Sequence, residues 1–519
     1  MRPMLRPDTE PARAPSTSLT PAVTAVDEAE VSGFDFWRQR AGFVLAPLAF
    51  AWVFVLTRPL EPPAHRLAAI LAAVVVLWIT EAIPMAVTAF LGVSAAVALQ
   101  IAPPTEAFAP FGDPLIFVFI GTFMLARAIT FHGLDRRFAF AILRLPGVGA
   151  RPARLLAAYA AVACVISMLV DSTATTAMML PIGLSLLGAL GAQGRDHGYA
   201  TALLLATAFA STVGGLATPI GAAPNLIGIG FIRREIGAPL PFFSWVLLGL
   251  PVAALLFGWV VVHLWQESVR MDGGTPPGAG PTSIQHPALA PWTRGQVNTL
   301  VACAVTVTLW FAPGVIALVV GYDHPLYRSV IATMPESVAA MIGTGLLFVL
   351  PTDVRRNRCT LPWSEAVQID WWIVFLYGGG IALGTLSFST GLAGAVGNGL
   401  TRHLGVHTRF GLLALATAIA TLLSEMTSNA AAANMVVPVV IACARSAGLD
   451  PLLPTVGATM GASLGFMLPV STPANAIVYG SGRVPLVEMM RCGLALDVVG
   501  VVVIVTVLSV LGPFVLGTP

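Results

Sequence analysis

Two short polar clusters interrupt the apolar sequence and carry its clearest chemistry. Asp171-Ser172-Thr173 is followed by Pro181 ten residues later, and Ser428-Asn429-Ala430 is followed by Pro438 at the same distance. Oxygens of these residue types accept the unpaired backbone N–H groups at the start of a helix, so each cluster is predicted to cap one. A helix that begins inside a membrane points its positive end at that position, which suits an anion.

A plainer interpretation is that these side chains only cap helices or bond to the preceding turn, as they often do in membrane helices. Two clusters at matching positions favour a binding site instead. Asp171 places a carboxylate where lipid is expected, so it is predicted to ligate a cation, carry a proton or pair with an arginine. Glu425, beside the second cluster, is predicted to face either a water-filled cavity or a structural partner.

A second pair of interruptions is rich in glycine and proline. Residues 214–225 and 461–475 place these residues inside otherwise apolar helices. Unwound backbone is tolerated at membrane depth only where it is buried in protein or lines a cavity, and its free carbonyl oxygens suit Na⁺. A simple proline kink is the alternative.

The interruptions belong to a repeat. Residues 114–121 match residues 371–378 at an offset of 257, and the two polar clusters recur at the same offset. Gly221–Asn225 matches Ser471–Asn475 at an offset of 250. Duplicated halves with two polar interruptions each are typical of secondary transporters built from inverted repeats, whose site lies near the membrane midplane.

The composition requires a bilayer around these helices. The 519 residues are 56% hydrophobic and only 10% charged, with a mean hydropathy of +0.84. The sequence therefore predicts an all-α polytopic membrane protein, and its short apolar stretches beside polar breaks suggest hairpins or broken helices as well as true spans. With a net charge of +2, no nucleic-acid partner is expected.

The halves are expected at residues 41–265 and 297–519, separated by a polar linker at 266–296. Residues 1–40 carry arginine, proline and acidic residues without an apolar signal segment, so they are predicted to be a disordered, cytoplasmic tail.

Several function classes are excluded by what the sequence lacks. It contains no lysine, so it has no nucleotide-binding GxxxxGK[ST] loop, and it has no credible HExxH or GxSxG motif. The five cysteines show no metal-binding spacing. No enzyme activity and no cofactor are therefore expected, and the lack of a TVGYG-like filter weakens a channel interpretation.

At these residues the chain resembles the divalent anion/sodium symporter family, over about residues 40–517. The resemblance is carried by five motifs, which are 78–89 (Trp-Ile-Thr-Glu-Ala-Ile-Pro and Ala-Val-Thr-Ala), 133–136 (Gly-Leu-Asp-Arg), 173–181 (Thr-Ala-Thr-Thr-Ala-Met-Met-Leu-Pro), 427–429 (Thr-Ser-Asn) and 466–476 (Phe-Met-Leu-Pro-Val-Ser-Thr-Pro-Ala-Asn-Ala). It implies about 11 transmembrane helices plus two re-entrant hairpins, multi-pass in the cytoplasmic (inner) membrane. It also implies a homodimer that works as an elevator, with a scaffold and a moving transport domain in each protomer. The hairpins would be 153–190 and 409–445, and the broken helices would lie near 218–225 and 470–475.

The resemblance also implies two sodium sites and a substrate site. The first sodium site would use Ser167, Asp171, Ser172 and Gly221. The second sodium site would use Ser424, Ser428, Asn429 and Ser471. The substrate would meet Ser172, Thr173, Ala222, Ala223, Asn429, Ala430, Thr472 and Pro473.

The first cluster departs from the family pattern more than the second. It reads Asp-Ser-Thr where Ser-Asn-Thr is expected, and the second cluster reads Ser-Asn-Ala. Ala222 and Ala223 replace a hydroxyl residue and a proline. A smaller or differently shaped anion is consistent with this loss, and Asp171 is predicted either to tighten the first cation site or to let H⁺ replace one Na⁺.

The expected function is Na⁺-coupled import of a small divalent anion, such as succinate, fumarate or malate. The alternatives are a sulfate or organosulfonate symporter, a proton-coupled variant and a Na⁺-independent anion exchanger. An anion channel is the alternative from another class, because helix ends can also line a pore. An intramembrane enzyme is disfavoured because Asp171 and Glu425 have no partnered nucleophile or metal set.

Overall fold

The computed structural model describes residues 33–144, 148, 151–190, 197–272, 290–321, 324–404 and 408–517. Ten of the described helices are long and apolar enough to cross a membrane. The number becomes eleven when α13 (Pro325–Thr333) and α14 (Glu336–Val349), bent by 54°, are taken as one span. The predicted all-α membrane fold is confirmed. Length alone does not separate spans from hairpin arms, because both arms of the second hairpin are among the ten.

The first half contains two helix pairs of special interest. The hairpin consists of α7 (Pro152–Ser167) and α8 (Ser172–Ala189), and the broken helix consists of α9 (His197–Leu216) and α10 (Ala223–Phe231). The remaining elements of this half are α1 (Gly33–Leu56), α2 (Pro62–Thr80), α3 (Met85–Ala98), α4 (Pro104–Ala107), the 3-10 turn η1 (Ala109–Gly112), α5 (Pro114–Phe131), α6 (Leu134–Leu143), the π-helical turn η2 (Ile232–Ile236) and α11 (Phe242–Met271).

The second half repeats this order. Its hairpin consists of α18 (Arg409–Met426) and α19 (Asn429–Ser446), and its broken helix consists of α20 (Leu452–Gly461) and α21 (Pro473–Tyr479). The remaining elements are α12 (Arg294–Val320), α13 and α14 as bounded above, strands β1 (Pro351–Asp353) and β2 (Arg358–Cys359), α15 (Trp363–Ala366), α16 (Trp371–Ser389), α17 (Leu392–Leu404) and α22 (Leu486–Leu516). The two strands pair antiparallel.

The helices begin where the sequence supplies a cap or a proline. Asp113 caps α5, Asp171 caps α8 and Ser428 caps α19 through their side-chain oxygens. Proline occupies the first turn of both short helices that follow the breaks, α10 and α21, where its missing N–H leaves no donor unpaired. The interruptions read from the sequence are therefore true helix ends, with unwound backbone at 217–222 and 462–472.

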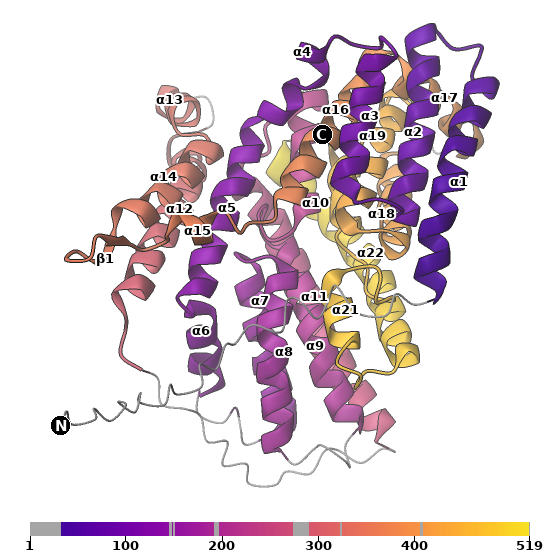
Figure 1. The fold of residues 1–519 in the computed structure, drawn as a ribbon. Coiled ribbons are helices and arrows are strands. Elements are labelled where there is room, and N and C mark those ends of the chain that lie inside the picture. Colours follow the sequence, from indigo (N-terminus) through magenta and orange to yellow (C-terminus); the bar gives the residue numbers. More distant parts are fainter. Residues whose placement is uncertain are drawn as a thin grey trace, which may run out of the picture.

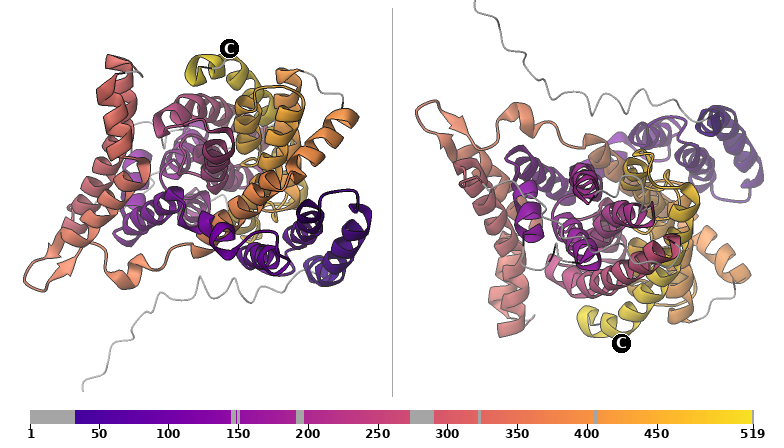
Figure 2. Two further views of the ribbon diagram at one scale, coloured as in Figure 1. Left: turned by 90° about the horizontal axis from the view of Figure 1, so that it is seen from above. Right: turned by 90° about the horizontal axis from the view of Figure 1, so that it is seen from below.

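The two hairpins occupy opposite parts of the molecule. Figure 1 shows α7 and α8 in its lower half and α18 and α19 in its upper half, the arrangement that inverted halves would give. Each short helix packs on the second arm of the other half's hairpin, α10 on α19 and α21 on α8. Seen from above, α12–α14 stand on one side and α1–α2 on the other, with the hairpins and broken helices between them (Figure 2).

Three boundaries differ from the sequence expectation. Helix α1 begins at Gly33, inside the predicted tail 1–40, while residues 1–32 lie outside the described residues. Helix α11 continues to Met271 and α12 starts at Arg294, so both helices enter the predicted linker 266–296. Charged residues in these stretches are compatible with helix ends that extend beyond the apolar core.

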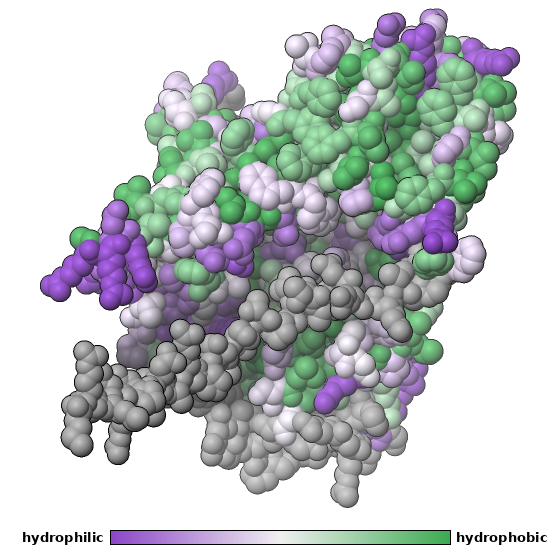
Figure 3. Space-filling model, in the orientation of Figure 1, coloured by the Kyte–Doolittle hydropathy of each residue, from purple (hydrophilic) through white to green (hydrophobic). Residues whose placement is uncertain are grey.

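The surface agrees with a membrane setting. Figure 3 shows hydrophobic residues over much of the upper face, whereas the projecting β1–β2 hairpin is hydrophilic. Large apolar side chains stay exposed on helices such as α1 and α12, with Trp52 at 68% and Val319 at 78% exposure. Lipid accepts such side chains, which water would not.

Candidate functional site

The tip of the second hairpin gathers three oxygen atoms. Ser424 Oγ lies 2.7 Å from Asn429 Oδ1 and 2.9 Å from the carbonyl oxygen of Ala462 in the broken helix. Ser424 is fully buried. Its hydroxyl has a single proton and satisfies only one of the two acceptors at a time. Three oxygens at this spacing form a set of ligands that a hard cation such as Na⁺ accepts.

Glycine leaves space beside these oxygens. The amide nitrogen of Asn429 donates to Ser463 O at 3.2 Å, which directs Oδ1 toward Ser424. A Cβ atom at Gly465 would lie 3.2 Å from Ser424 Oγ and 3.3 Å from Asn429 Oδ1. Gly465 also has a φ of +151°, which L side chains rarely adopt. The residues present therefore fit a small cation at this position.

The second tip is also hydrogen-bonded to the last turn of α2 and the first residue of α3. Thr427 Oγ1 donates to Trp78 O at 3.1 Å, and Ser428 Oγ lies 3.0 Å from Met85 Sδ. Ser428 Oγ accepts the Ala431 N–H as well. The predicted role of Ser428 as a sodium ligand stays a prediction, since its hydroxyl faces Met85 here.

The first tip has fewer partners. Asp171 accepts the Thr173 N–H at 2.8 Å, and Asp171, Ser172 and Thr173 are all half-buried. Ser167, the counterpart of Ser424, is fully buried, yet its hydroxyl has no hydrogen-bond partner among the described residues. An unpaired buried hydroxyl costs about 1–3 kcal/mol. A bound cation would satisfy the Ser167 oxygen, so this tip also fits one.

Backbone from the first broken helix closes around Ser167. A Cβ at Gly221 would lie 2.9 Å from Ser167 O and 2.6 Å from Gly215 O, so only glycine fits. Thr218 Oγ1 donates to Met168 O at 2.5 Å and accepts the Gly221 N–H at 3.1 Å. The structure thus brings Ser167 and Gly221 together, as the sequence predicted.

Two asparagines hold the unwound segments in the same way. Asn225 Nδ2 donates to Gly215 O and Thr218 O, both at 2.8 Å. Asn475 Nδ2 donates to Gly465 O and Leu468 O, both at 3.1 Å. The asparagine and both of its acceptor residues in one half lie 250 residues from their counterparts in the other half. The repeat seen in the sequence is therefore also present in the hydrogen bonds. The side chain of Asn225 also accepts Ser463 Oγ at 3.1 Å, which joins the two broken helices.

Glu425 has a structural partner. Its carboxylate accepts the Met467 N–H at 2.9 Å, the Leu468 N–H at 3.2 Å and the Ser471 hydroxyl at 2.5 Å. Of the two alternatives left open by sequence, the structural one describes this geometry. Because the Ser471 hydroxyl donates to Glu425, a sodium-ligand role for Ser471 would depend on its backbone oxygen and stays a prediction.

Sequence reasoning missed Asp497 of α22, which is 5% exposed and lies against the Glu425 side chain. Two carboxyl groups are both acceptors, so a proton on one of them is needed to join them. The signal was available, because an acid inside the apolar run 492–516 is as unusual as Asp171. The carbonyl oxygen of Ala462 was also missed, and no side-chain pattern marks it.

The remaining predicted residues lie at the starts of the two short helices or at the second tip. Ala222 precedes α10 and Ala223 begins it, both half-buried. Thr472 caps α21 by accepting the Asn475 N–H at 3.1 Å, and the exposed Pro473 follows. Ala430 is buried in the first turn of α19. Among the described residues no hydrogen bond joins one tip to the other, so the predicted substrate set is not closed by direct bonds.

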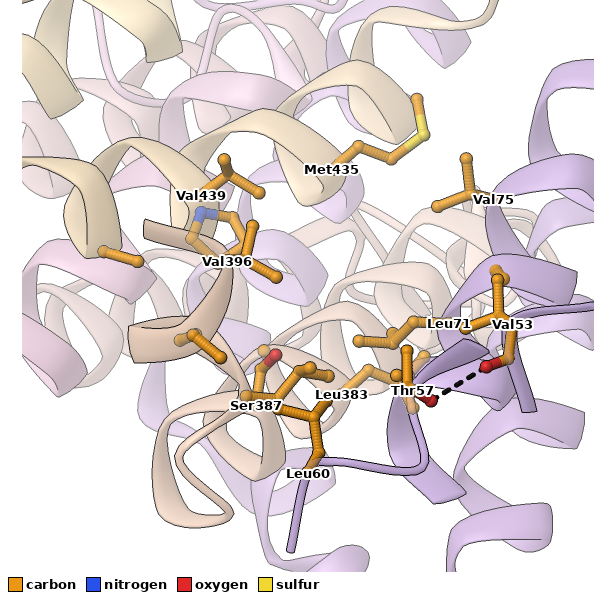
Figure 4. A pocket seen from close by; sticks show the side chains of 18 of the residues that line it. Val53, Thr57, Leu60, Leu71, Val75, Leu383, Ser387, Val396, Met435 and Val439 are labelled. Carbon is orange, nitrogen blue, oxygen red and sulfur yellow. Dashed lines mark hydrogen bonds between the residues drawn. The ribbon is translucent and has the colours of Figure 1, made fainter. Parts of the chain in front are cut away.

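A large cavity lies elsewhere. About 680 Å³ of space opens between α1, α2, α16, α17 and α19. Figure 4 shows its apolar wall, with Val53, Leu71, Leu383 and Val396 among the labelled side chains. No charged residue lines it. A divalent anion needs donors or cations, so this cavity is not a suitable place for one.

The tips can bind ions but carry no reaction machinery. Their chemistry consists of hydroxyl, amide, carboxylate and backbone oxygens at the starts of helices. In the part of the chain that the structure describes, no group of three or more His, Cys, Asp or Glu could hold a metal ion. The starts of α8, α10 and α19 offer the positive ends of their helix dipoles to an anion, while Asp171 and Ser428 each accept one N–H of the helix that they cap.

Comparisons with known proteins cover nearly the whole chain. Residues 38–517 match the family described as the sodium:sulfate symporter transmembrane region. The sodium-dependent dicarboxylate transporter SdcS of Staphylococcus saprophyticus is 31% identical over 92% of each chain. SdcS proteins of Staphylococcus aureus, such as that of strain bovine RF122, are 30% identical over 92% of each chain.

A solved structure is similar in fold. The YdaH transporter of Alcanivorax borkumensis, described as having an unusual topology, superposes with a TM-score of 0.53. The match covers 81% of this chain and 89% of that chain, at 14% sequence identity. At that identity the similarity supports the fold alone.

Proposed function

This chain belongs to the sodium:sulfate symporter family, and we propose that it imports a C4-dicarboxylate such as succinate, fumarate or malate together with Na⁺. Its family and relatives make it a multi-pass membrane transport protein of the sodium-coupled dicarboxylate and sulfate class, and not an enzyme. The choice of substrate, the stoichiometry and the mechanism of movement are the parts that we propose.

The observation that carries the proposal is the oxygen set of Ser424, Asn429 and Ala462. These atoms lie within hydrogen-bonding distance of one another, yet one hydroxyl proton serves them. A cation bound between these atoms would contact all three oxygens, beside the start of α19. Na⁺ binding there would order the tip and place positive charge next to a substrate carboxylate.

A dicarboxylate is favoured over a monovalent anion by the duplicated geometry. Each half offers a hairpin tip and a short helix, so two carboxylates could each meet one helix start. The names of the SdcS relatives, which are sodium-dependent dicarboxylate transporters, support the same choice. Ser172, Thr173 and Asn429 would be the polar contacts, with Ala222, Ala223, Ala430, Thr472 and Pro473 as walls.

We propose that movement follows an elevator scheme in a homodimer in the cytoplasmic membrane. The moving unit would comprise α7–α11 and α18–α22, because α7 and α8 pack on α9, α18 packs on α20 and α22, and Asn225 is bonded to Ser463. The scaffold would comprise α1–α6 and α12–α17. Rigid-body movement of such a unit around a fixed site is the usual way in which repeat-built transporters alternate access.

Asp171 favours one second candidate, coupling to H⁺ in place of one Na⁺. It is the carboxylate at the first tip where the family pattern has a neutral serine, and a carboxylate accepts a proton as readily as a cation. Sulfate or organosulfonate transport and anion exchange remain alternatives within the family. A channel is the alternative from another class.

The test is uptake of labelled succinate into proteoliposomes containing the purified protein. We expect uptake to require an inward Na⁺ gradient and to fall about tenfold or more in Ser424→Ala, because a ligand contact to a charged group is lost. The exposed Ser389 gives a matched control, and Ser389→Ala should transport normally.

Each other outcome identifies an alternative. Uptake that follows a proton gradient in K⁺ would point to H⁺ coupling, and uptake that needs internal dicarboxylate would point to exchange. Stronger competition by sulfate than by fumarate would assign the substrate differently. Large unitary currents would contradict a transporter altogether.

A further inference from the structure

An ion pair joins the start of α5 to the turn after the first broken helix. Arg233 Nη2 donates to Asp113 Oδ1 at 3.0 Å. The same oxygen accepts the Leu115 N–H at 2.8 Å and the Tyr377 hydroxyl at 3.2 Å. The Asp113 side chain is only 13% exposed, against 38% for Arg233. The pair therefore fastens three elements together: α5, α16 and the turn η2 after α10.

This contact crosses the boundary between the two units of the proposed mechanism. Asp113 and Tyr377 belong to the scaffold, whereas Arg233 follows the broken helix of the moving unit. A unit that slides along the scaffold cannot keep this pair throughout the cycle. The pair is thus a property of one end state.

The repeat supplies a second pair of the same residue types. Asp370 follows Asp113 by 257 residues, the offset that relates α16 to α5. Arg483 follows Arg233 by 250 residues, the offset that relates α21 to α10. Each half therefore has an aspartate at the start of the matching scaffold helix and an arginine in the turn after its short helix.

The second pair is separated in this state. Asp370 begins α16 without a capping hydrogen bond, and Arg483 is bonded through its backbone, with its N–H 3.4 Å from Ser481 Oγ and its carbonyl oxygen 3.5 Å from Thr201 Oγ1. Neither residue has an ion pair among the residues that the structure describes. In Figure 1, α21 and the turn after it lie below the start of α16.

Asp370 lacks a cation where it stands. The Asp370 side chain is exposed, and Asp171 places a second carboxylate near it. A guanidinium group brought to this position would offset the repulsion between the two carboxylates. In the first half, Arg233 is paired with the partly buried Asp113.

We propose that Asp370 and Arg483 form an ion pair in the opposite end state of transport, where the Asp113–Arg233 pair is broken. The inference rests on the proposed alternating movement of inverted halves. Such halves exchange their conformations between the two end states, so a contact that one half makes here is made by the other half there. Upward movement of the moving unit in Figure 1 would carry α21 toward the start of α16.

The two aspartates are not equivalent within the scaffold. Tyr377 of α16 donates to Asp113, whereas the equivalent residue of α5 is Ile120, which has no donor. Because Asp113 and Tyr377 both belong to the scaffold, this hydrogen bond holds Asp113 in place in both end states.

Disulfide crosslinking tests the exchange directly. The five free cysteines, Cys164, Cys303, Cys359, Cys443 and Cys492, are first replaced, and succinate uptake by that variant is verified. Asp113→Cys/Arg233→Cys and Asp370→Cys/Arg483→Cys are then oxidised in membrane vesicles. We expect each double variant to crosslink, each crosslink to stop uptake, and a reductant to restore it. The mobility of the protein on non-reducing gels gives the crosslinked fraction.

Charge exchange gives an independent readout that needs no background substitutions. Asp370→Arg and Arg483→Asp should each lower uptake about tenfold, because each single change places two like charges together. The double exchange should recover most of the uptake, because it restores a pair of opposite charges. Asp353→Arg, in the exposed β1–β2 hairpin where Asp353 lies 3.8 Å from Arg356, is the matched control and should not alter uptake.

The outcomes separate the inference from the proposed function. If the Asp370–Arg483 cysteine pair never crosslinks and the double exchange gives no recovery, while wild-type uptake of succinate is normal, the inference is wrong and the function stands. If the Asp113–Arg233 crosslink forms without stopping uptake, the pair does not need to break and the inference is again wrong. If the wild-type protein does not transport, the proposed function fails first.

Discussion

The two hairpin tips occupy equivalent positions but are built from different chemistry. At the second tip, Ser424 is bonded to Asn429 and to backbone of the broken helix, and Thr427 is bonded to Trp78 in the last turn of α2. At the first tip, the equivalent Ser167 hydroxyl is buried without a partner among the described residues, and Asp171 caps its own helix. One tip is held by hydrogen bonds between neutral groups, and the other has a carboxyl group and a buried oxygen without a partner among the described residues.

The difference extends to how each tip is tied to its broken helix. In the first half the Thr218 hydroxyl bonds to the backbone of Met168. In the second half the equivalent residues are Leu468 and Glu425, and the Glu425 carboxylate accepts the backbone N–H of Leu468. Each half thus has one acid beside its tip, at positions that are not equivalent: Asp171 is a ligand candidate in the first half, and Glu425 braces the loop in the second. Duplication preserved the shape while the two sites diverged.

The largest expected effect is on the second tip. Asn429→Ala should lower kcat/KM for succinate about 100-fold, since contacts to charged groups contribute about 1.5–3 kcal/mol each and this residue is expected to meet both ion and substrate. Uptake by proteoliposomes over a range of succinate and Na⁺ gives the number. Asn298→Ala, which removes an amide bonded to Pro351 O and Thr360 Oγ1, is the control. An equal loss of kcat/KM in both variants would contradict a role of the second tip in binding ion and substrate.

The next largest effect is expected at Glu425, which braces the loop after α20. Glu425→Gln should reduce the free energy of unfolding by about 2 kcal/mol, because a carboxylate that accepts three hydrogen bonds is replaced by a group with one acceptor oxygen. Thr218→Val, at the corresponding tie in the first half, should reduce it by about 1 kcal/mol. Denaturant unfolding of the purified protein without Na⁺ measures both. The comparison of the ties is wrong if Thr218→Val is the more damaging change.

A smaller effect is expected when the first tip is made to resemble the second. Asp171→Ser should raise the Na⁺ concentration for half-maximal uptake about tenfold, because a charge near the cation is removed but partly screened by water. Asp171→Asn, which keeps an oxygen to cap α8, should behave alike if charge is the cause. If the dependence of uptake on external Na⁺ and on pH is the same as in wild type, Asp171 takes no part in coupling.

The smallest effect separates the two buried serines. Ser167→Ala should leave stability without Na⁺ unchanged or slightly raised, because it deletes an unpaired hydroxyl, whereas Ser424→Ala should lower it by about 1 kcal/mol. Addition of Na⁺ should then stabilise the Ser167→Ala variant less than wild type. Thermal unfolding with Na⁺ or K⁺ measures this shift. Equal Na⁺ stabilisation of wild type and Ser167→Ala would place the cation elsewhere.

Much of the fold was predictable because its signals are local. Apolar stretches, helix caps and prolines fix where helices start and stop. The hairpins that the family resemblance implied, 153–190 and 409–445, lie within one residue of the ends of α7–α8 and α18–α19. The repeat was visible because both halves keep their landmark residues at nearly constant offsets. These features need only neighbouring residues and hydropathy to be recognised.

The partners of the polar side chains were not predictable in the same way. Glu425 was open between a cavity and a brace, and the structure places it on Leu468 and Ser471, more than forty residues away in the chain. Ser471 was expected to face a cation, but its hydroxyl serves Glu425. Backbone ligands such as Ala462 O leave no trace in side-chain type, so no sequence pattern could reveal them.

By itself the sequence determined that this is a duplicated helical membrane protein with oxygens gathered at four breaks, because lipid permits polar groups only where protein encloses them. Only the tertiary structure decided which of those oxygens meet one another. That choice depends on how α18 packs on α20 and α7 on α9, since a hydrogen bond forms or fails within a few tenths of an ångström. It made the second tip a closed set of oxygens and left the first with an unmet one.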